Sequence, residues 1–175
     1  FLPDKNEENR EYLNQIEEMA ISAGFRFYAQ VPWIKGAGRN TGRKVKDREN
    51  IVFFSKGKAR ELRRDAKKEK SDPSKEYRMS GAKRMLPPSF EYPAPSKKER
   101  IHQAEKPLDL LKEIIDLISV EQELGLDQFA GSGVAGEAAL ESNRDMILIE
   151  EDKDTFNKMK ERISRKGKVQ DEKIL

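Results

Sequence analysis

The sequence predicts an α/β protein, and three observations lead to this fold class. A short apolar run ends at Asp127, three glycines follow it, and a helix-favouring run then leads into a second apolar run that ends at Glu150. Apolar residues recur at helical spacing in three further segments, which are residues 7–23, 107–118 and 153–166. Two segments rich in aromatic and β-branched residues, 25–31 and 50–55, predict strands.

The first predicted helix ends at Gly24, a residue type that is common just past a helix C-terminus. The strand 25–31 follows it, and residues 32–35 are expected to leave this strand. Residues 36–44 combine glycine with basic side chains and predict a flexible basic loop. The continuous apolar run in 50–55 predicts a strand that is buried on both faces.

The middle of the chain is basic and irregular. Residues 56–70 form a charged run with helical composition, and residues 71–100 contain five prolines and little periodicity. The net charge is +8 over residues 55–100 and −6 over residues 101–175. This asymmetry suits a polyanionic partner such as nucleic acid. A solvated linker would have the same composition, so the charge alone leaves both interpretations open.

The composition excludes several classes of protein. The chain has 175 residues, of which 35% are hydrophobic and 38% charged, and it contains no cysteine and a single histidine, His102. Disulfides and thiolate metal sites are therefore absent, and a protein-only zinc site is not expected. No apolar run approaches the roughly 20 residues of a membrane span. The sequence begins without a signal peptide or an initiator methionine, which predicts an intracellular protein with residues upstream of Phe1.

The glycines at 131, 133 and 136 formally fit the G-x-G-x-x-G pattern of dinucleotide-binding proteins, with Glu150 near the expected place of the ribose acid. Two features count against an NAD site. The segment 127–130 lies between the apolar run and the first glycine, whereas a dinucleotide turn begins as its strand ends. Only 25 residues follow Glu150, which leaves no room for a second nucleotide-binding half.

The residues around the glycines carry a closer resemblance. His102-Gln-Ala-Glu-Lys-Pro107 and its helix, Asp127-x-Phe-Ala-Gly-Ser-Gly133 and Ile149-Glu-x-Asp152 together resemble the C-terminal half of amino-group DNA methyltransferases of the N4-cytosine/N6-adenine family. The order is that of the permuted members, with the catalytic segment first and the cofactor segment last. Weaker matches at Gly24-Phe25, Trp33-x-Lys35 and residues 48–57 extend the resemblance over nearly all of 10–165.

The resemblance implies a Rossmann-like fold that binds S-adenosyl-L-methionine and lacks the central strands and catalytic loop of the family's N-terminal part. Residues 1–57 would be the last strands of the catalytic half, 58–100 a variable segment like those that recognise the target, and 101–175 the cofactor-binding half. Without the central strands, two half-sheets with unpaired edges are expected. The predicted cofactor-binding residues are His102, Lys106, Pro107, Asp127, Phe129, Ala130, Gly131, Ser132, Gly133 and Glu150.

The chemistry of S-adenosylmethionine fits these positions. Glu150 can accept hydrogen bonds from the ribose hydroxyls, and Asp127 can pair with the ammonium group, directly or through water. The backbone N–H groups of 130–133, with Lys106 nearby, can hold the carboxylate. Phe129 can pack on adenine or shape the pocket.

The resemblance also implies double-stranded DNA as the substrate, with the target base turned out of the duplex. Lys35, Arg39 and Arg43 could bind DNA phosphates or simply solvate a loop. Trp33 and Phe25 are expected in the core rather than stacked on a base. The expected setting is the cytoplasm of a bacterium, an archaeon or a phage host, in restriction–modification or an orphan role, and a homodimer is compatible with it.

Two departures from the family pattern stand out. Gln128 replaces the usual proline, which removes only a fixed backbone angle. The family's catalytic loop, an Asp, Asn or Ser followed by Pro-Pro and an aromatic residue, has no counterpart; Leu86-Pro-Pro-Ser89 lacks the flanking groups. In the permuted order this loop would lie before residue 7, so no catalytic residue is predicted within the chain. A catalytically incomplete relative that only binds DNA or cofactor is the main alternative.

Overall fold

A computed structural model describes residues 1–3, 10–41, 44–59, 62, 67–68, 76–77, 85–96, 100–102 and 104–166, without the side chains of 37–46, 67–68 and 76–77. The chain divides into two units, Phe1–Pro93 and Ala94–Leu175. Each unit has its own sheet, and β2 and β3 of the first do not pair with β7 and β8 of the second among the described residues. This separation agrees with the expectation of two half-sheets.

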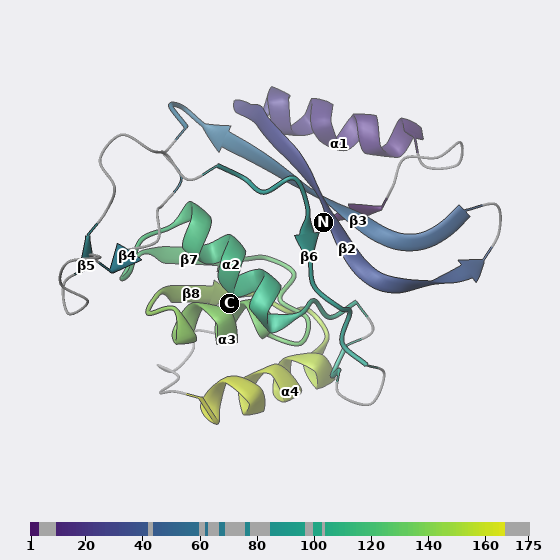
Figure 1. Cartoon of the computed structure of the whole chain (residues 1–175). Coiled ribbons are helices and arrows are strands. Elements are labelled where there is room, and N and C mark those ends of the chain that lie inside the picture. Colours follow the sequence, from purple (N-terminus) through teal and green to yellow (C-terminus); the bar gives the residue numbers. More distant parts are fainter. Residues whose placement is uncertain are drawn as a thin grey trace. The chain divides into compact units, whose positions relative to one another are not determined.

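The N-terminal unit is built on a long antiparallel hairpin (Figure 1). Strand β2 (Phe25–Thr41) pairs with β3 (Lys44–Lys56) from Phe25 opposite Lys56 to Thr41 opposite Lys44. Two short strands complete the sheet in the order β1-β3-β2-β6, with β1 at Leu2–Pro3 and β6 at Phe90–Glu91. Helix α1 (Arg10–Ser22) packs against β2. A separate strand pair joins β4 (Lys67–Lys68) and β5 (Glu76–Tyr77).

The prediction of a flexible loop at 36–44 was wrong for most of its length. Residues 32–41 remain in β2, because β3 provides partners for their backbone groups as far as Thr41, with a register irregularity between Ile34 and Arg39. Glycine and asparagine are poor strand formers, and pairing with the next strand of the hairpin overrides this preference. The prediction that 50–55 is buried on both faces was also too strong, since only Asn50 and Ile51 are fully buried there.

The core of this unit gathers around Trp33. The indole is 2% exposed, and its Nε1–H donates to the Tyr92 carbonyl at 2.8 Å. Phe90 lies beside Trp33 in the sheet register and is 1% exposed. The prediction that Trp33 belongs to the core is therefore confirmed, whereas Phe25 is partly exposed and was placed in the core wrongly.

The C-terminal unit follows the predicted order of elements (Figure 1). It contains α2 (Leu108–Ile118), β7 (Leu124–Asp127), α3 (Val134–Glu141), β8 (Asp145–Leu148) and α4 (Lys153–Ser164). Strands β7 and β8 are parallel, with Asp127 opposite Leu148. Helix α2 begins one residue after Pro107, which is its N-cap rather than an early helical residue. The N-cap of α4 is Asp152, and its side chain accepts from the Thr155 N–H at 2.8 Å.

Among the described residues of this unit, helices cover one face of the two-stranded sheet. Helix α2 buries Leu110, Ile114 and Leu117, which share one face, and packs against α3. Alternate side chains on the strands and just beyond them point away from this packing and are between 49% and 64% exposed: Leu124, Leu126, Ile147 and Ile149. A parallel sheet is normally covered on both faces.

Candidate functional site

The candidate site lies where the two parallel strands end. The Asp127 carboxylate accepts from the Phe129 N–H at 3.1 Å through Oδ1, and the Asp127 carbonyl accepts from the Ile149 N–H at 2.9 Å. The first contact closes a short turn of the kind that Asp favours. The second carboxylate oxygen, Oδ2, has no hydrogen bond among the described residues. The turn therefore holds Asp127 at the mouth of the glycine segment.

The backbone of the glycine segment is largely committed to internal hydrogen bonds. The Ala130 N–H donates to the Ile149 carbonyl at 2.9 Å, and the Gly133 N–H donates to the Ala130 carbonyl at 2.8 Å. The Gly131 N–H donates to Glu150 Oε2 at 2.7 Å. Among the described residues, the Ser132 N–H is the amide of this segment that has no partner. Of the four N–H groups predicted to bind an anion in 130–133, that of Ser132 is thus the one still available.

Glu150 joins the two sides of the site. Its Oε2 accepts from Gly131, and its Oε1 accepts from the Asp152 N–H at 3.0 Å. Each carboxylate oxygen can accept a further hydrogen bond. The same carboxylate can thus hold the loop in shape and receive hydroxyl groups of a bound nucleoside.

A side chain at each of the three glycine positions would meet different neighbours. At Gly131, with φ of 53°, a Cβ would stand 3.7 Å from the His102 ring, which is ordinary contact distance. At Gly133, with φ of 75°, a Cβ would lie 2.4 Å from Cγ of Met159. At Gly136 it would lie 2.5 Å from Leu148 Cδ1. A Cβ at Gly133 or Gly136 would thus crowd apolar side chains of the core, whereas a Cβ at Gly131 would only contact His102, another predicted cofactor-binding residue.

The segment 102–107 brings the remaining predicted residues to the site. His102 is exposed, and its Nδ1 accepts from the Ala104 N–H at 3.2 Å. Lys106 is half-buried, and Pro107 is buried where it precedes α2. Phe129 is 89% exposed, so its ring is free to meet a ligand. The structure thus places His102 beside the glycine segment and puts Phe129 at its surface.

Sequence reasoning missed the charged residues beneath the loop. Arg162 of α4 pairs with Glu105 at 3.0 Å and with Glu137 of α3 at 2.6 Å. Both carboxylates are buried. The sequence does contain a signal for these buried charges. Glu137 interrupts a run of small residues that faces the core, and Arg162 lies between Met159 and Ile163 on the inner side of its helix.

Hydrogen bonds hold these groups in their charged forms. Burial by itself would raise the pKa of Glu105, but hydrogen bonds from the Ile101 N–H, Arg162 and Ser132 outweigh it and lower the pKa below the ordinary value. Burial likewise opposes the charge on Arg162, while Glu137 and Glu105 raise its pKa. The hydrogen bond from Lys112 lowers the pKa of Glu141.

Acidification is expected to destabilise the C-terminal unit. The ordinary pKa is 4.5 for both Glu105 and Glu141, and both are lowered in the fold. Such a carboxylate contributes its full stabilisation above the unfolded-state pKa, and the contribution is lost as the pH falls through the folded-state pKa. The melting temperature, followed by circular dichroism, should therefore fall below about pH 4.5. Glu105→Gln should flatten this fall, and a parallel fall in the variant and the wild type would contradict the assignment.

The predicted DNA-binding residues belong to the N-terminal unit. Lys35 forms an ion pair with Glu49, and its Nζ lies 5.1 Å from the centroid of the Trp33 ring. Arg39 is in β2 opposite Lys46, but its side chain is not described, and Arg43 lies outside the described residues. Lys35 is thus partly neutralised within the sheet.

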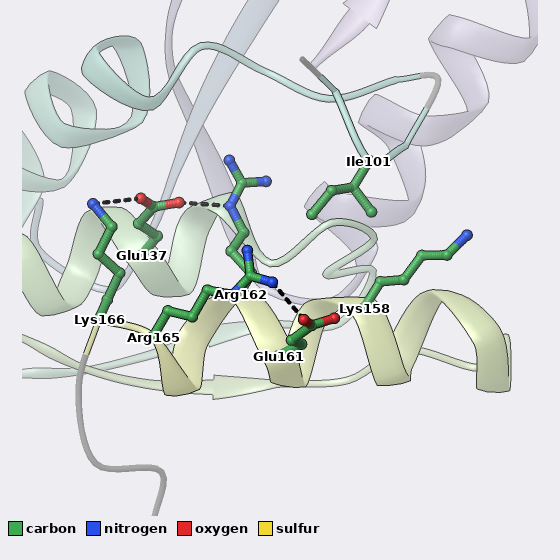
Figure 2. A pocket seen from close by; sticks show the side chains of 7 residues that line it. All are labelled: Ile101, Glu137, Lys158, Glu161, Arg162, Arg165 and Lys166. Atoms are coloured by element: carbon green, nitrogen blue, oxygen red, sulfur yellow. Dashed lines mark hydrogen bonds and ion pairs between the residues drawn. The ribbon is translucent and has the colours of Figure 1, made fainter. Parts of the chain in front are cut away.

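A cavity of about 430 Å³ lies along α4 (Figure 2). Charged side chains of α4 and the turn after it line the cavity, together with Ile101 and Glu137. None of the predicted cofactor-binding residues lines it, and its basic groups largely pair with neighbouring acids. We therefore place the candidate site at the loop.

The part of the chain that the structure describes offers neither a metal centre nor a membrane span. No group of three or more His, Cys, Asp or Glu side chains there could hold a metal ion. None of the helices among these residues is long and apolar enough to cross a membrane.

Comparisons with known proteins agree with the geometry. The family model N6_N4_Mtase, described as DNA methylase, matches residues 4–161. The type II methyltransferase M.HindIII from Haemophilus influenzae is 46% identical over 56 residues, which make up 32% of this chain and 18% of that protein. The chain thus spans less than a fifth of that relative.

Solved structures show the same fold. The complex of M1.HpyAVI with SAM superposes with a TM-score of 0.67 at 23% identity, covering 88% of this chain and 70% of the other. The cytosine-N4-specific PvuII DNA methyltransferase superposes with a TM-score of 0.63 at 16% identity, covering 88% of this chain and 60% of the other. At these identities the likeness establishes the α/β fold.

Proposed function

This chain belongs to the N6/N4 DNA methylase family, and we propose that it forms the S-adenosylmethionine-binding part of an enzyme that methylates an exocyclic amino group in DNA. The acceptor would be N6 of adenine or N4 of cytosine. One observation carries the proposal: Asp127, the glycine segment and Glu150 converge at the carboxyl ends of two parallel strands. Open α/β sheets bind their ligands at this edge.

The residues present fit this cofactor. Glu150 would receive the ribose hydroxyls, and the second oxygen of Asp127 would face the ammonium group. The Ser132 N–H, with Lys106, would hold the carboxylate, and the exposed ring of Phe129 would cover the adenine. When bound, the cofactor supplies an electrophilic methyl group. The similar structure of M1.HpyAVI is a complex with SAM, which supports this assignment.

The amino group to be methylated needs its own binding groups, and residues 1–175 supply no recognisable set. The segment around Pro87 and Pro88 leads into β6, where Phe90 is buried in the sheet rather than offered to a base. We therefore assign no catalytic residue here. We expect the chain, incubated alone with DNA and labelled S-adenosylmethionine, to transfer no methyl group. Transfer above background would contradict this and would also exclude the catalytically incomplete alternative.

Calorimetry with S-adenosylhomocysteine and NAD tests the cofactor. The site should bind S-adenosylhomocysteine at one equivalent per chain and should not bind NAD. Binding of NAD alone would favour the dinucleotide alternative raised by the glycine pattern, and binding of neither would overturn the assignment.

The proposed partner is double-stranded DNA, bound through the N-terminal unit. In the double variant Arg39→Ala/Arg43→Ala, the slope of the logarithm of the DNA-binding constant against the logarithm of the salt concentration should become shallower by up to about 2. Each phosphate contact contributes about 0.9 to this slope. Lys153→Ala/Lys158→Ala removes the same charge from the C-terminal unit and should leave the slope unchanged. Equal changes in both variants would show that net charge, rather than these arginines, drives binding.

The remaining expectations concern assembly and setting. A cytoplasmic location follows from the proposed substrate. Sedimentation of the purified chain tests whether it forms a homodimer, and a single species at the monomer mass would show that it does not.

A further inference from the structure

A buried ion cluster lies directly behind the proposed cofactor site. The guanidinium of Arg162 reaches Glu105 Oε1 through Nη1 at 3.0 Å and Glu137 Oε2 through Nε at 2.6 Å. Glu105 is 9% exposed and Glu137 5%. Figure 2 shows Arg162 rising from α4 toward Glu137. The cluster therefore links α3 and α4 to the segment that carries His102 and Lys106.

The carboxylates of the cluster have further partners. Glu105 Oε2 accepts from the Ile101 N–H at 2.9 Å, and Glu137 Oε1 pairs with Lys166 at 3.1 Å. Among the described residues, no buried side-chain nitrogen or oxygen lacks a hydrogen bond. Such completeness is what allows charges to remain inside a protein.

The cluster also contacts the glycine segment itself. Nη1 of Arg162 lies 3.5 Å from the Ser132 carbonyl, and the Ser132 hydroxyl hydrogen-bonds Glu105. Ser132 is 3% exposed, so its position is fixed by these neighbours. The Ser132 N–H is the amide of 130–133 that has no partner among the described residues, and we assign it to the cofactor carboxylate. The cluster therefore sets the direction of this donor.

A buried ion cluster is weak support for stability, because apolar side chains of similar size often serve as well. Its geometric effect is specific. The walls of the site, 102–107 and 127–133, are separated along the chain by α2 and β7, and the cluster joins them directly. Arginine suits this place because its planar fork can hold two acids in fixed directions, which a lysine cannot do.

We propose that Arg162 and Glu105 are positioning residues that fix the segment 102–107 against the glycine segment and so set the affinity for the cofactor. The inference rests on the proposed function. It predicts that disturbing the cluster changes cofactor binding in a protein that remains folded.

Glu105→Gln tests the inference with little change in volume. Its amide group must face either Arg162 or the Ile101 N–H, so one donor meets another donor in a buried place. We expect S-adenosylhomocysteine affinity to fall about tenfold, the effect of losing one hydrogen bond to a charged group. Calorimetry is done at a temperature at which thermal unfolding curves show each variant to be fully folded.

Glu141→Gln is the matched control. Glu141 accepts from Lys112 at 2.9 Å and from Lys166 at 3.1 Å, so the same substitution disturbs the neighbouring ion pairs without touching Ser132 or Glu105. Its affinity for S-adenosylhomocysteine should stay within about twofold of the wild type. Arg162→Lys keeps the charge but cannot hold both acids, and it should lose affinity as Glu105→Gln does.

Hydrogen exchange provides a second measurement. In Glu105→Gln, peptides covering 100–107 and 130–137 should exchange faster than in the wild type, whereas Glu141→Gln should leave them unchanged. Unchanged affinity and exchange in folded Glu105→Gln and Arg162→Lys would overturn the positioning role. Failure of the wild-type chain to bind S-adenosylhomocysteine would instead refute the proposed function.

Discussion

Replacement of Glu150 by glutamine is expected to weaken S-adenosylhomocysteine binding by about 2–4 kcal/mol, or roughly 30- to 700-fold. Hydrogen bonds from the ribose hydroxyls to a carboxylate are stronger than those to a neutral amide. The variant also disturbs the loop, because the Gly131 and Asp152 N–H groups each donate to one oxygen of Glu150, and the glutamine NH₂ must face one of them. Calorimetry on the folded variant measures the loss.

Glu151→Gln is the control for this experiment. Glu151 is the neighbouring acid, and it is exposed and has no role in the proposed site. The same change of charge one residue away should leave the affinity within about twofold of the wild type. Equal losses in the two variants would indicate a general electrostatic effect and would remove Glu150 from the site.

Gly133→Ala is expected to destabilise the C-terminal unit by about 2–5 kcal/mol. The backbone of Gly133 has a φ of 75°, at which a residue with a side chain is strained. The new Cβ would also lie 2.4 Å from Met159 Cγ and 3.4 Å from Met159 Cβ. Met159 is 4% exposed, so moving its Cγ away from the new Cβ would require repacking of the core. Denaturant unfolding of the whole chain measures the loss.

Gly57→Ala separates the two causes. Gly57 has the same φ of 75°, but a Cβ there would have no neighbour within 4 Å. It should therefore show only the strain of the left-handed backbone, about 1–2 kcal/mol. If the two variants lost the same stability in their respective units, the packing of α4 against the glycine segment would not be the reason for Gly133.

Residues 101–152 show how far a sequence can predict a site. The order of strand, glycine turn, helix, strand and acid was correct, because each element depends on local patterns: apolar runs of strand length, glycines at the turn and Asp152 at the start of α4. The family suggested by these residues is confirmed by the match over residues 4–161. The cofactor roles of the individual residues stay predictions.

The remaining features depend on pairing and packing between segments rather than on local patterns. Residues 36–41 look like a loop, and pairing with β3 makes them a strand. Three of the four amides in 130–133 proved to be engaged within the protein, two of them by Ile149 and Glu150, which lie beyond α3. Arg162 falls on the apolar side of its predicted helix, but only the packing of α4 brings it between Glu105 and Glu137.

Hydrogen exchange with and without S-adenosylhomocysteine tests most directly whether the glycine segment and Glu150 form the cofactor site. The ligand should protect peptides that cover 100–107, 127–134 and 149–152, and it should leave 158–166, along the α4 cavity, unchanged. Protection confined to 158–166, or no protection at a saturating ligand concentration, would contradict the account.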